Sequence, residues 1–144
     1  MSKDIKGNMK FGNHIINNNQ IFYLRKFVFG FVNIRPFLPG HVLLAPVRQE
    51  KKFSDLTETE AMEMWISAKN IAQNLKKFYH VESVQISIQD GEDSGQTVDH
   101  CHIHIIPIPA KYSPNKIDDL SKKNRTSEEM AQEAEDYKEN FVFN

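Results

Sequence analysis

The amino-acid sequence predicts a single α+β domain whose strands form an antiparallel sheet. Four short stretches rich in β-forming residues follow one another with turn residues between them, which favours antiparallel pairing of neighbours. A long amphipathic helical pattern then precedes two further strands, and a second helical pattern ends the chain. The 144 residues are enough for one hydrophobic core, and no linker or repeat indicates a second domain.

Turn and breaker residues bound the first four strands, which we expect at 11–16, 21–24, 27–34 and 41–46. The run 17–20, which reads Asn-Asn-Asn-Gln, separates the first two, so we predict that they form a hairpin. Residues 1–10 are polar. We therefore expect a disordered N-terminus at 1–10 and a single domain over 11–144.

Residues 57–79 carry the pattern of a long helix that covers one face of the sheet. Thr57 and Glu60 fit a capping box at its start. Helical spacing predicts that Trp65 is a core residue rather than a base-stacking one. The apolar residues that share this spacing are Ala61, Trp65, Ala68, Ala72 and Leu75. A last helix begins near Thr126, and its apolar stripe is Met130, Ala134, Tyr137 and Phe141.

The alternating segment 82–89 is predicted to be a half-buried strand whose apolar side is formed by Val84, Ile86 and Ile88. Gln89 ends this strand on its polar side. The loop that follows offers flexible backbone and polar donors of the kind that hold phosphate oxygens. Its members of this kind are Gly91, Ser94, Gly95, Gln96 and Thr97. Taken alone, a glycine-bearing hairpin turn explains the loop equally well.

The segment 100–107 is predicted to be a strand with His100, His102 and His104 at every second position. In a strand these imidazoles share one face, about 7 Å apart, because successive side chains alternate between faces. The residues that alternate with them, Cys101, Ile103 and Ile105, would pack on the opposite face. Prolines 107 and 109 are expected to end the strand, since proline lacks the N–H of the ladder.

The residues alone leave three interpretations of the histidine row. The histidines could be surface residues without function, or they could bind zinc. A zinc site needs a ligand from His41 or Asp99, because outer histidines about 14 Å apart cannot both form bonds of about 2 Å to one ion. In the third interpretation a neutral imidazole attacks an electrophile. His102 is then the natural nucleophile, because it has an imidazole on either side.

Composition excludes several other classes of function. The formal net charge is -1, which gives no basic field for nucleic acid or an anionic membrane. The single cysteine excludes an internal disulfide and fits a reducing compartment. The sequence shows no signal-peptide core and no apolar run that approaches about 20 residues. We therefore expect a soluble protein of the cytoplasm, or of the nucleus, without nucleic-acid or membrane partners.

The histidine row also resembles a known family. His-Cys-His-Ile-His-Ile-Ile at 100–106 matches the signature of the histidine triad superfamily. The wider chain, about residues 10–142, is similar to the fragile histidine triad branch, the diadenosine polyphosphate hydrolases. The segments that carry this similarity are Phe-Gly-Asn-His at 11–14, Asn33 with Pro-Phe-Leu-Pro-Gly-His-Val-Leu at 36–43, Gln-Asp-Gly at 89–91, Gly-Gln-Thr-Val at 95–98 and Ser-Glu-Glu-Met-Ala at 127–131.

The resemblance implies a HIT-like fold with a five-stranded antiparallel sheet, one long helix and a C-terminal helix. It also implies a homodimer whose two sheets join across the interface. The reaction that it implies is hydrolysis of a dinucleoside polyphosphate, such as diadenosine triphosphate, to AMP and a nucleoside diphosphate. The intermediate would be an adenylyl group on His102, with His104 and Gln89 donating to phosphoryl oxygens. His100 would orient His102, and His41 would support the triad.

The substrate-binding residues that the resemblance implies are Phe11, His14, Asn33, Gly95, Gln96, Thr97 and Val98. It implies no tightly bound cofactor and no metal held by the protein, so Mg²⁺ would accompany the substrate phosphates. Ile108-Pro109 stands where a basic residue is common in the branch, and the segment 110–126 is shortened, which leaves recognition of the distal nucleoside open. The alternatives are a purine nucleoside phosphoramidase of the same superfamily and a dinucleotide-binding signalling protein with slow turnover.

Overall fold

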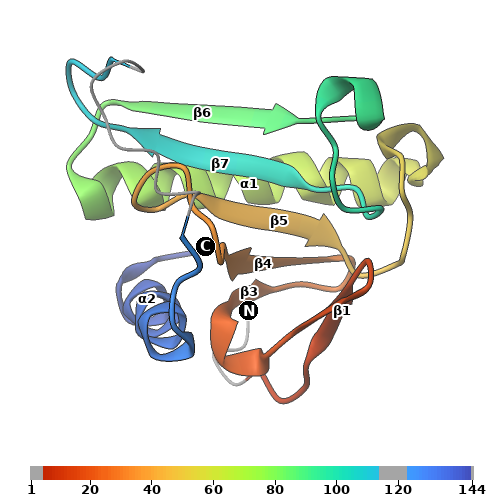
Figure 1. The fold of residues 1–144 in the computed structure, drawn as a ribbon, viewed down its shortest axis with the longest axis horizontal. Coiled ribbons are helices and arrows are strands. Elements are labelled where there is room, and N and C mark those ends of the chain that lie inside the picture. Colours follow the sequence, from red (N-terminus) through yellow and green to blue (C-terminus); the bar gives the residue numbers. More distant parts are fainter. Residues whose placement is uncertain (1–4, 114–122, 144) are drawn as a thin grey trace.

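A five-stranded antiparallel sheet forms the centre of the molecule in the computed structural model, which describes residues 5–113 and 123–143 (Figure 1). The strands lie across the sheet in the order β3 (Ile21–Leu24), β4 (Val28–Val32), β5 (Val42–Pro46), β7 (Ile103–Ile108) and β6 (Ser83–Ile88). The long helix α1 (Glu58–Tyr79) and the helix α2 (Ser127–Asn140) share one core with the sheet. The predicted α+β class, the five antiparallel strands and both helices are therefore confirmed.

A small two-stranded hairpin covers the other face of the sheet. Strands β1 (Met9–Phe11) and β2 (His14–Ile16) pair with each other, and together with Ile5 and the outward side chains of β4 they form a second core. Three short 3-10 turns complete the described elements: η1 (Asn18–Gln20), η2 (Phe53–Asp55) and η3 (Glu92–Ser94). None of the helices in the described ranges is both long and apolar enough to cross a membrane.

The N-terminal predictions need two corrections. Residues 11–16 are not one strand paired with 21–24, because Gly12 adopts a left-handed conformation (φ 57°) and turns the chain back on itself; β3 pairs with β4 instead. Glycine adopts this conformation without steric penalty. Disorder was also expected as far as residue 10, whereas β1 begins at Met9 and Ile5 is buried. The remainder of that expected tail, residues 1–4, lies outside the described residues.

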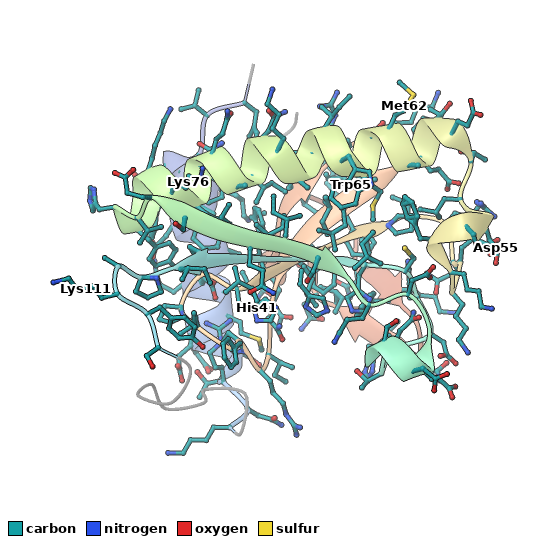
Figure 2. The ribbon with its side chains drawn as sticks, turned by 90° about the horizontal axis from the view of Figure 1, so that it is seen from above. His41, Asp55, Met62, Trp65, Lys76 and Lys111 are labelled. Atoms are coloured by element: carbon teal, nitrogen blue, oxygen red, sulfur yellow. The ribbon has the colours of Figure 1, made fainter. Side chains whose placement is uncertain are left out.

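Helix α1 begins as predicted, but its buried stripe is rotated. The Thr57 hydroxyl accepts a hydrogen bond from the Glu60 N–H (3.1 Å), and the Glu60 carboxylate accepts one from the Thr57 N–H (2.8 Å). The prediction that Trp65 is a core residue is wrong: its side chain is 43% exposed (Figure 2). Met64 is buried instead, and the next residue lies about 100° further around a helix. The buried apolar stripe is Met64, Ala68, Ile71, Ala72 and Leu75.

Strand β7 begins later and ends later than the histidine pattern predicted. The chain at 100–102 leaves the ladder, because the Cys101 N–H donates to the Glu50 carbonyl (2.7 Å). Pro107 does not end the strand but pairs with Val84, at a point where β5 has already stopped. A missing N–H is tolerated where a strand has a neighbour on one side only. Cys101, Ile103 and Ile105 lie in the core, as expected.

The C-terminal helix confirms its predicted stripe. Met130, Ala134, Tyr137 and Phe141 are all buried, and Thr126 caps the first turn through the Glu129 N–H (3.1 Å). Within the segment 110–126, which the sequence indicates to be irregular, residues 114–122 lie outside the described residues. Strand β6 forms one edge of the sheet, so its hydrogen-bonding groups on the outer side have no neighbouring strand among residues 5–113 and 123–143.

Candidate active site

His100 is fixed by backbone groups on both of its ring nitrogens. Its Nε2 lies 2.8 Å from the Pro46 carbonyl oxygen, and its Nδ1 lies 3.0 Å from the Gly12 N–H. A carbonyl oxygen can only accept, so Nε2 carries the hydrogen and Nδ1 accepts from Gly12. The side chain is fully buried, and burial lowers its pKa. His100 is therefore a neutral, immobilised residue with no free nitrogen.

His102 presents a nitrogen lone pair in consequence. Its Nδ1 lies 2.7 Å from the carbonyl oxygen of His100, so Nδ1 carries the hydrogen and donates it. The Nε2 atom of the neutral ring is then unprotonated. Burial lowers the pKa of His102, which keeps the ring neutral at pH 7. A neutral imidazole with an available lone pair is a competent nucleophile.

His41 determines the tautomer of His104. The Phe37 N–H donates to His41 Nδ1 (2.9 Å), so the hydrogen of the neutral His41 ring is on Nε2. That N–H points to His104 Nδ1 at 3.0 Å, and the hydrogen of His104 is therefore on its own Nε2. Burial lowers the pKa of His41 to about 3 and the pKa of His104 to about 4, and neighbouring imidazoles reinforce both shifts.

The unprotonated Nε2 of His102 and the Nε2–H donor of His104 therefore belong to neighbouring rings. The rings of His102 and His104 are 4.8 Å apart between centroids, closer than the strand spacing predicted, because only His104 of the triad lies within β7. The Nε2 of His104 is buried and has no hydrogen-bond partner among the described residues. An unpaired buried donor is costly unless a ligand satisfies it. The pair can attack an electrophilic centre and stabilise negative charge beside it.

The same geometry counts against the zinc interpretation. Both nitrogens of His100 are occupied by backbone groups, so this ring offers no lone pair to a metal. Asp99, one suggested further ligand, is turned toward the Lys51 ammonium group (3.5 Å). His41, the other, uses both nitrogens within the site. The four histidines are held by two separate hydrogen bonds, from His41 to His104 and from His102 to the His100 carbonyl, rather than as a set of converging ligands.

Gln89 and the loop after it meet at Gly95. Gln89 follows the last residue of β6 and is half-buried. A methyl group at Gly95, which has φ 96°, would come within 2.6 Å of the Gln89 amide nitrogen. Glycine therefore allows the amide to approach the loop. Thr97 is exposed, and Val98 packs against Gly12, where a methyl group would lie 2.8 Å from Val98 Cγ1.

The Gln96 side chain, which is predicted to hold the phosphate chain, is hydrogen-bonded to backbone groups at both ends. It is buried, and its Nε2 donates to the carbonyl oxygens of Lys51 and Val98 (2.9 Å each). Its Oε1 accepts from the Gly91 N–H (2.8 Å). With both ends of the amide hydrogen-bonded to backbone, this side chain shapes the loop rather than contacting a phosphate. Side-chain amides are common turn-stabilising groups, and the sequence pattern does not distinguish the two roles.

The remaining predicted ligands lie at different depths. Phe11 is buried against the rings of His100 and His102 (centroids 5.1 and 5.0 Å), so it supports the triad rather than lining an open cleft. His14 lies exposed on β2. Asn33 is half-buried beside His41, and the Arg35 N–H holds its Oδ1 (2.9 Å). Asn33 Nδ2 faces the His41 N–H at 3.4 Å; both atoms are donors, so the amide keeps a hydrogen for a ligand.

Sequence reasoning missed the groups that fix the tautomers. These are backbone atoms: the Gly12 N–H, the Phe37 N–H, and the carbonyl oxygens of Pro46 and His100. Backbone donors carry no signal of their own in a sequence, although a glycine inside an apolar stretch does indicate a close approach.

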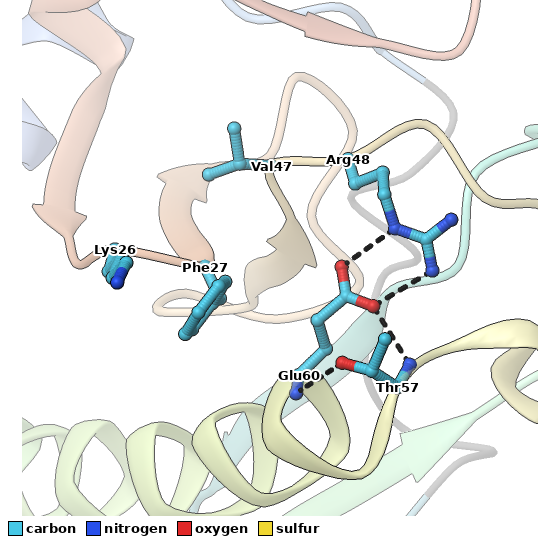
Figure 3. A pocket seen from close by; sticks show the side chains of 6 residues that line it. All are labelled: Lys26, Phe27, Val47, Arg48, Thr57 and Glu60. Carbon is cyan, nitrogen blue, oxygen red and sulfur yellow. Dashed lines mark hydrogen bonds and ion pairs between the residues drawn. The ribbon is translucent and has the colours of Figure 1, made fainter.

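A separate cavity of about 360 Å³ lies where β5 meets the start of α1, and Figure 3 shows the side chains that line it. The Arg48 guanidinium donates to both carboxylate oxygens of Glu60 (3.1 and 2.8 Å), which keeps the pKa of Glu60 below its usual range. Glu60 also completes the Thr57 capping box. Arg48 and Glu60 therefore neutralise each other and link the end of β5 to the start of α1. Because these charges are already paired, they do not indicate a ligand for the cavity.

Comparison with known proteins establishes the family. The model of the HIT domain matches residues 16–111, more than half of the chain. The chain therefore belongs to the HIT domain family, the histidine triad proteins. Its relatives are of the fragile histidine triad type: a bifunctional bis(5'-adenosyl)-triphosphatase/adenylylsulfatase of Arabidopsis thaliana is 35% identical over 149 aligned positions, which cover 91% of this chain and 83% of the relative.

Two crystal structures show the same fold. The NitFhit protein of Caenorhabditis elegans superposes with a TM-score of 0.84 and 39% identity, covering 94% of this chain but 31% of that longer fusion protein. A diadenosine triphosphate hydrolase of Plasmodium falciparum, solved with cyclomarin A, gives a TM-score of 0.85 and 31% identity over 96% of this chain and 88% of that chain.

The three buried histidines His41, His100 and His102, together with the half-buried His104, predict that acid destabilises the fold. Their pKa values lie below the usual 6.5, so in this range the unfolded chain binds protons that the folded chain does not. The free energy of unfolding should fall as the pH falls below about 6.5, by about 1.4 kcal/mol per pH unit for each histidine that stays unprotonated in the folded chain. His41 and His104, whose pKa values are about 3 and about 4, should stay so down to about pH 5. Urea unfolding at pH 7, 6 and 5 measures this slope. His41→Gln should flatten it and the exposed His80→Asn should not; a wild-type stability equal at pH 7 and 5 would contradict the account.

Proposed function

We propose that this chain hydrolyses dinucleoside polyphosphates such as diadenosine triphosphate, releasing AMP and a nucleoside diphosphate. The single observation that carries the proposal is the unprotonated Nε2 of His102 beside the N–H of His104, which has no partner within the described ranges. The activities printed in the names of the Arabidopsis and Plasmodium relatives support the choice of substrate.

The first chemical step is an in-line attack by His102. The Nε2 lone pair forms a bond to the α-phosphorus, and the bond from that phosphorus to the bridging oxygen breaks. The bridging oxygen leaves with its electron pair on the nucleoside diphosphate. The ring becomes positively charged, and its Nδ1 hydrogen bond to the His100 carbonyl (2.7 Å) stabilises that charge. His100 thus acts on the nucleophile through its backbone oxygen, while its buried ring fixes the position of that oxygen.

Charge on the phosphoryl oxygens requires donors that are already oriented. The His104 N–H is one, held by His41, and the Gln89 amide beside Gly95 is the second. Around them, the backbone of Gly95 with Thr97 and Val98 holds the phosphate chain, and Asn33 with His14 holds the nucleoside.

Mg²⁺ enters with the substrate phosphates, so the rate of hydrolysis should fall on chelation without any loss of protein stability.

The second step transfers the nucleotide to water. Water attacks the same phosphorus, the phosphorus–nitrogen bond breaks, and its electron pair returns to Nε2, so His102 becomes neutral again. One hydrogen of the water stays on the AMP phosphate and the other is released to solvent as a proton. Each of the two displacements inverts the configuration at phosphorus, so the net outcome is retention. A single attack by an activated water, as at a metal-hydroxide centre, gives inversion instead.

The stereochemical course tests this proposal directly. The substrate is diadenosine triphosphate made chiral with sulfur at the α-phosphorus and cleaved in isotopically labelled water. Retention in the thiophosphate analogue of AMP is expected. Inversion would rule out the intermediate on His102, and absence of cleavage of the unmodified substrate would rule out the activity itself.

We also propose that the protein is a homodimer joined through α1 and β6. Strand β6 is an edge strand whose outer backbone groups pair with no strand in the described part of the chain, and such an edge is a template for pairing with another chain. Trp65 on α1 and Ile86 on β6 are exposed large apolar residues that flank this edge, and Trp65 extends from α1 toward β6 in Figure 2. Burial of these residues in an interface would account for their exposure in the single chain.

The homodimer predicts a mass twice that of the chain in sedimentation equilibrium. The double variant Trp65→Glu, Ile86→Glu should be a monomer, because charges on an apolar interface are left without partners. Val142→Glu is the control, since Val142 is also an exposed apolar residue but lies beyond α2. A monomeric wild type would overturn this proposal.

The cytoplasm, with the nucleus as the alternative, is the proposed location, and this proposal rests on the single buried thiol of Cys101.

A further inference from the structure

Arg125 joins the helix α2 to the loop 33–41, which ends at His41. Its guanidinium donates to the Asn33 carbonyl oxygen from both Nε (3.2 Å) and Nη2 (2.6 Å). Its backbone N–H donates to the Ile34 carbonyl (3.1 Å), and Arg35 Nε donates to Asn124 Oδ1 (2.5 Å). The chain before α2 is therefore held against residues 33–35, the point at which the chain leaves β4.

A directional set of hydrogen bonds holds the guanidinium itself. Glu133 on α2 accepts an ion pair from Arg125 Nη1 (2.6 Å) and a hydrogen bond from the Tyr137 hydroxyl (2.5 Å). Because Tyr137 donates its hydrogen to Glu133, the Tyr79 hydroxyl of α1 must donate to Tyr137 (2.7 Å). Burial raises the pKa of Glu133, while Tyr137 and Arg125 oppose that rise. The Glu133 side chain is 12% exposed, so the pair is largely removed from water.

Stability alone does not explain a pair of this kind. Apolar residues of similar volume often stabilise a protein as well as a buried ion pair does, because taking two charges out of water is costly. The Arg125 fork has a second feature that an apolar residue cannot reproduce: it fixes one carbonyl oxygen in the backbone. That carbonyl belongs to Asn33, at the start of the loop that returns to the sheet at β5.

The loop 33–41 connects the backbone group that Arg125 holds, the Asn33 carbonyl, to His41, which orients the His104 N–H. Among the described residues it has no regular secondary structure, so its position depends on such contacts. The Phe37 N–H within it sets the tautomer of His41, and His41 sets that of His104. If Phe37 moves, His41 can carry its hydrogen on Nδ1 instead, and the His104 ring then loses the partner that points its own N–H at the substrate.

We propose that Arg125 is a positioning residue for phosphoryl transfer: by holding the Asn33 carbonyl it keeps the loop 33–41 in the geometry that gives His104 a hydrogen on Nε2. The role rests on the proposed function, in which that N–H donates to the phosphoryl oxygen. Arg125 itself touches neither the reacting atoms nor the triad.

The test compares Arg125→Ala with Met130→Ala. Met130 is buried on the same helix, and its truncation loosens the packing of α2 without removing the contact to Asn33. Both variants are studied below their unfolding transitions. The readouts are kcat and KM for diadenosine triphosphate and, without substrate, the ring ¹⁵N chemical shifts of His41 and His104, which report the tautomer.

Arg125→Ala is expected to lower kcat about 10- to 100-fold with a smaller change in KM, as displaced catalytic groups do. The ¹⁵N shifts should show His41 and His104 in mixed tautomers. Met130→Ala should keep the native tautomers and a kcat within about threefold of wild type. The proposal is overturned if Arg125→Ala keeps both, or if Met130→Ala changes them equally. If the wild type hydrolyses no dinucleotide, the proposed function fails while the tautomer comparison still tests Arg125.

Discussion

Replacing His102 with asparagine is expected to lower kcat by at least about 10⁴-fold, as loss of a covalent nucleophile does in other enzymes. The asparagine amide can still donate to the His100 carbonyl in place of Nδ1, so the local fold and the neighbouring tautomers should persist. It has no lone pair that can form the phosphorus–nitrogen bond. Binding of diadenosine triphosphate should therefore stay within about fivefold of wild type, since the lost interaction is made mainly in the transition state.

Single-turnover cleavage and calorimetric titration measure the two quantities on the same preparation. His80→Asn is the matched control, because His80 is exposed at the end of α1 with φ 54°, a conformation that asparagine tolerates well. It should retain wild-type rate and affinity. A rate for His102→Asn within tenfold of wild type would remove His102 as the nucleophile, whatever the family resemblance.

Gly40→Ala should be among the most destabilising substitutions in the chain. Gly40 has φ 86°, and a methyl group there would lie 2.5 Å from Tyr79 Cε2 and 2.7 Å from Pro107 Cγ. Both neighbours are rings that cannot move aside by a rotamer change. We expect a loss of about 2–5 kcal/mol in the free energy of unfolding, from backbone strain and overpacking together.

Two other glycines separate these contributions in urea unfolding. Gly91 has φ 104° with nothing within 4 Å of an added methyl group, so Gly91→Ala measures strain alone. Gly7 has neither a positive φ nor a close neighbour, and Gly7→Ala should stay within about 0.5 kcal/mol of wild type. Gly40→Ala equal to Gly91→Ala would show that the two rings yield. Gly40 also precedes His41. If Gly40→Ala lowers the free energy of unfolding more than Gly91→Ala does, it should therefore lower the catalytic activity as well.

Most of the elements follow from short-range patterns. The capping box at Thr57 and the start of the last helix near Thr126 are confirmed, because a cap depends on residues three positions apart. The buried stripe of α2 is confirmed for the same reason. The histidine spacing, with the glutamine and glycine segments before it, was specific enough to indicate the family. Nothing beyond local sequence was needed for these conclusions.

Contacts between distant segments decided the rest. Trp65 is exposed because the side of α1 that packs on the sheet includes Met64 instead, and helical spacing alone allows either residue on the buried side. The Gln96 amide is held within the loop because it donates a hydrogen bond to the carbonyl oxygen of Lys51, which is distant in the sequence.

For the site, the sequence by itself determined that three imidazoles lie close together beside a loop with glycines and polar donors. Only the tertiary structure decided which nitrogen of each ring carries its hydrogen. The partners that decide it are the Gly12 and Phe37 N–H groups and the Pro46 and His100 carbonyls, and most of them come from segments far from the triad. A tautomer depends on the direction of a hydrogen bond, which is a property of folded backbone rather than of residue type.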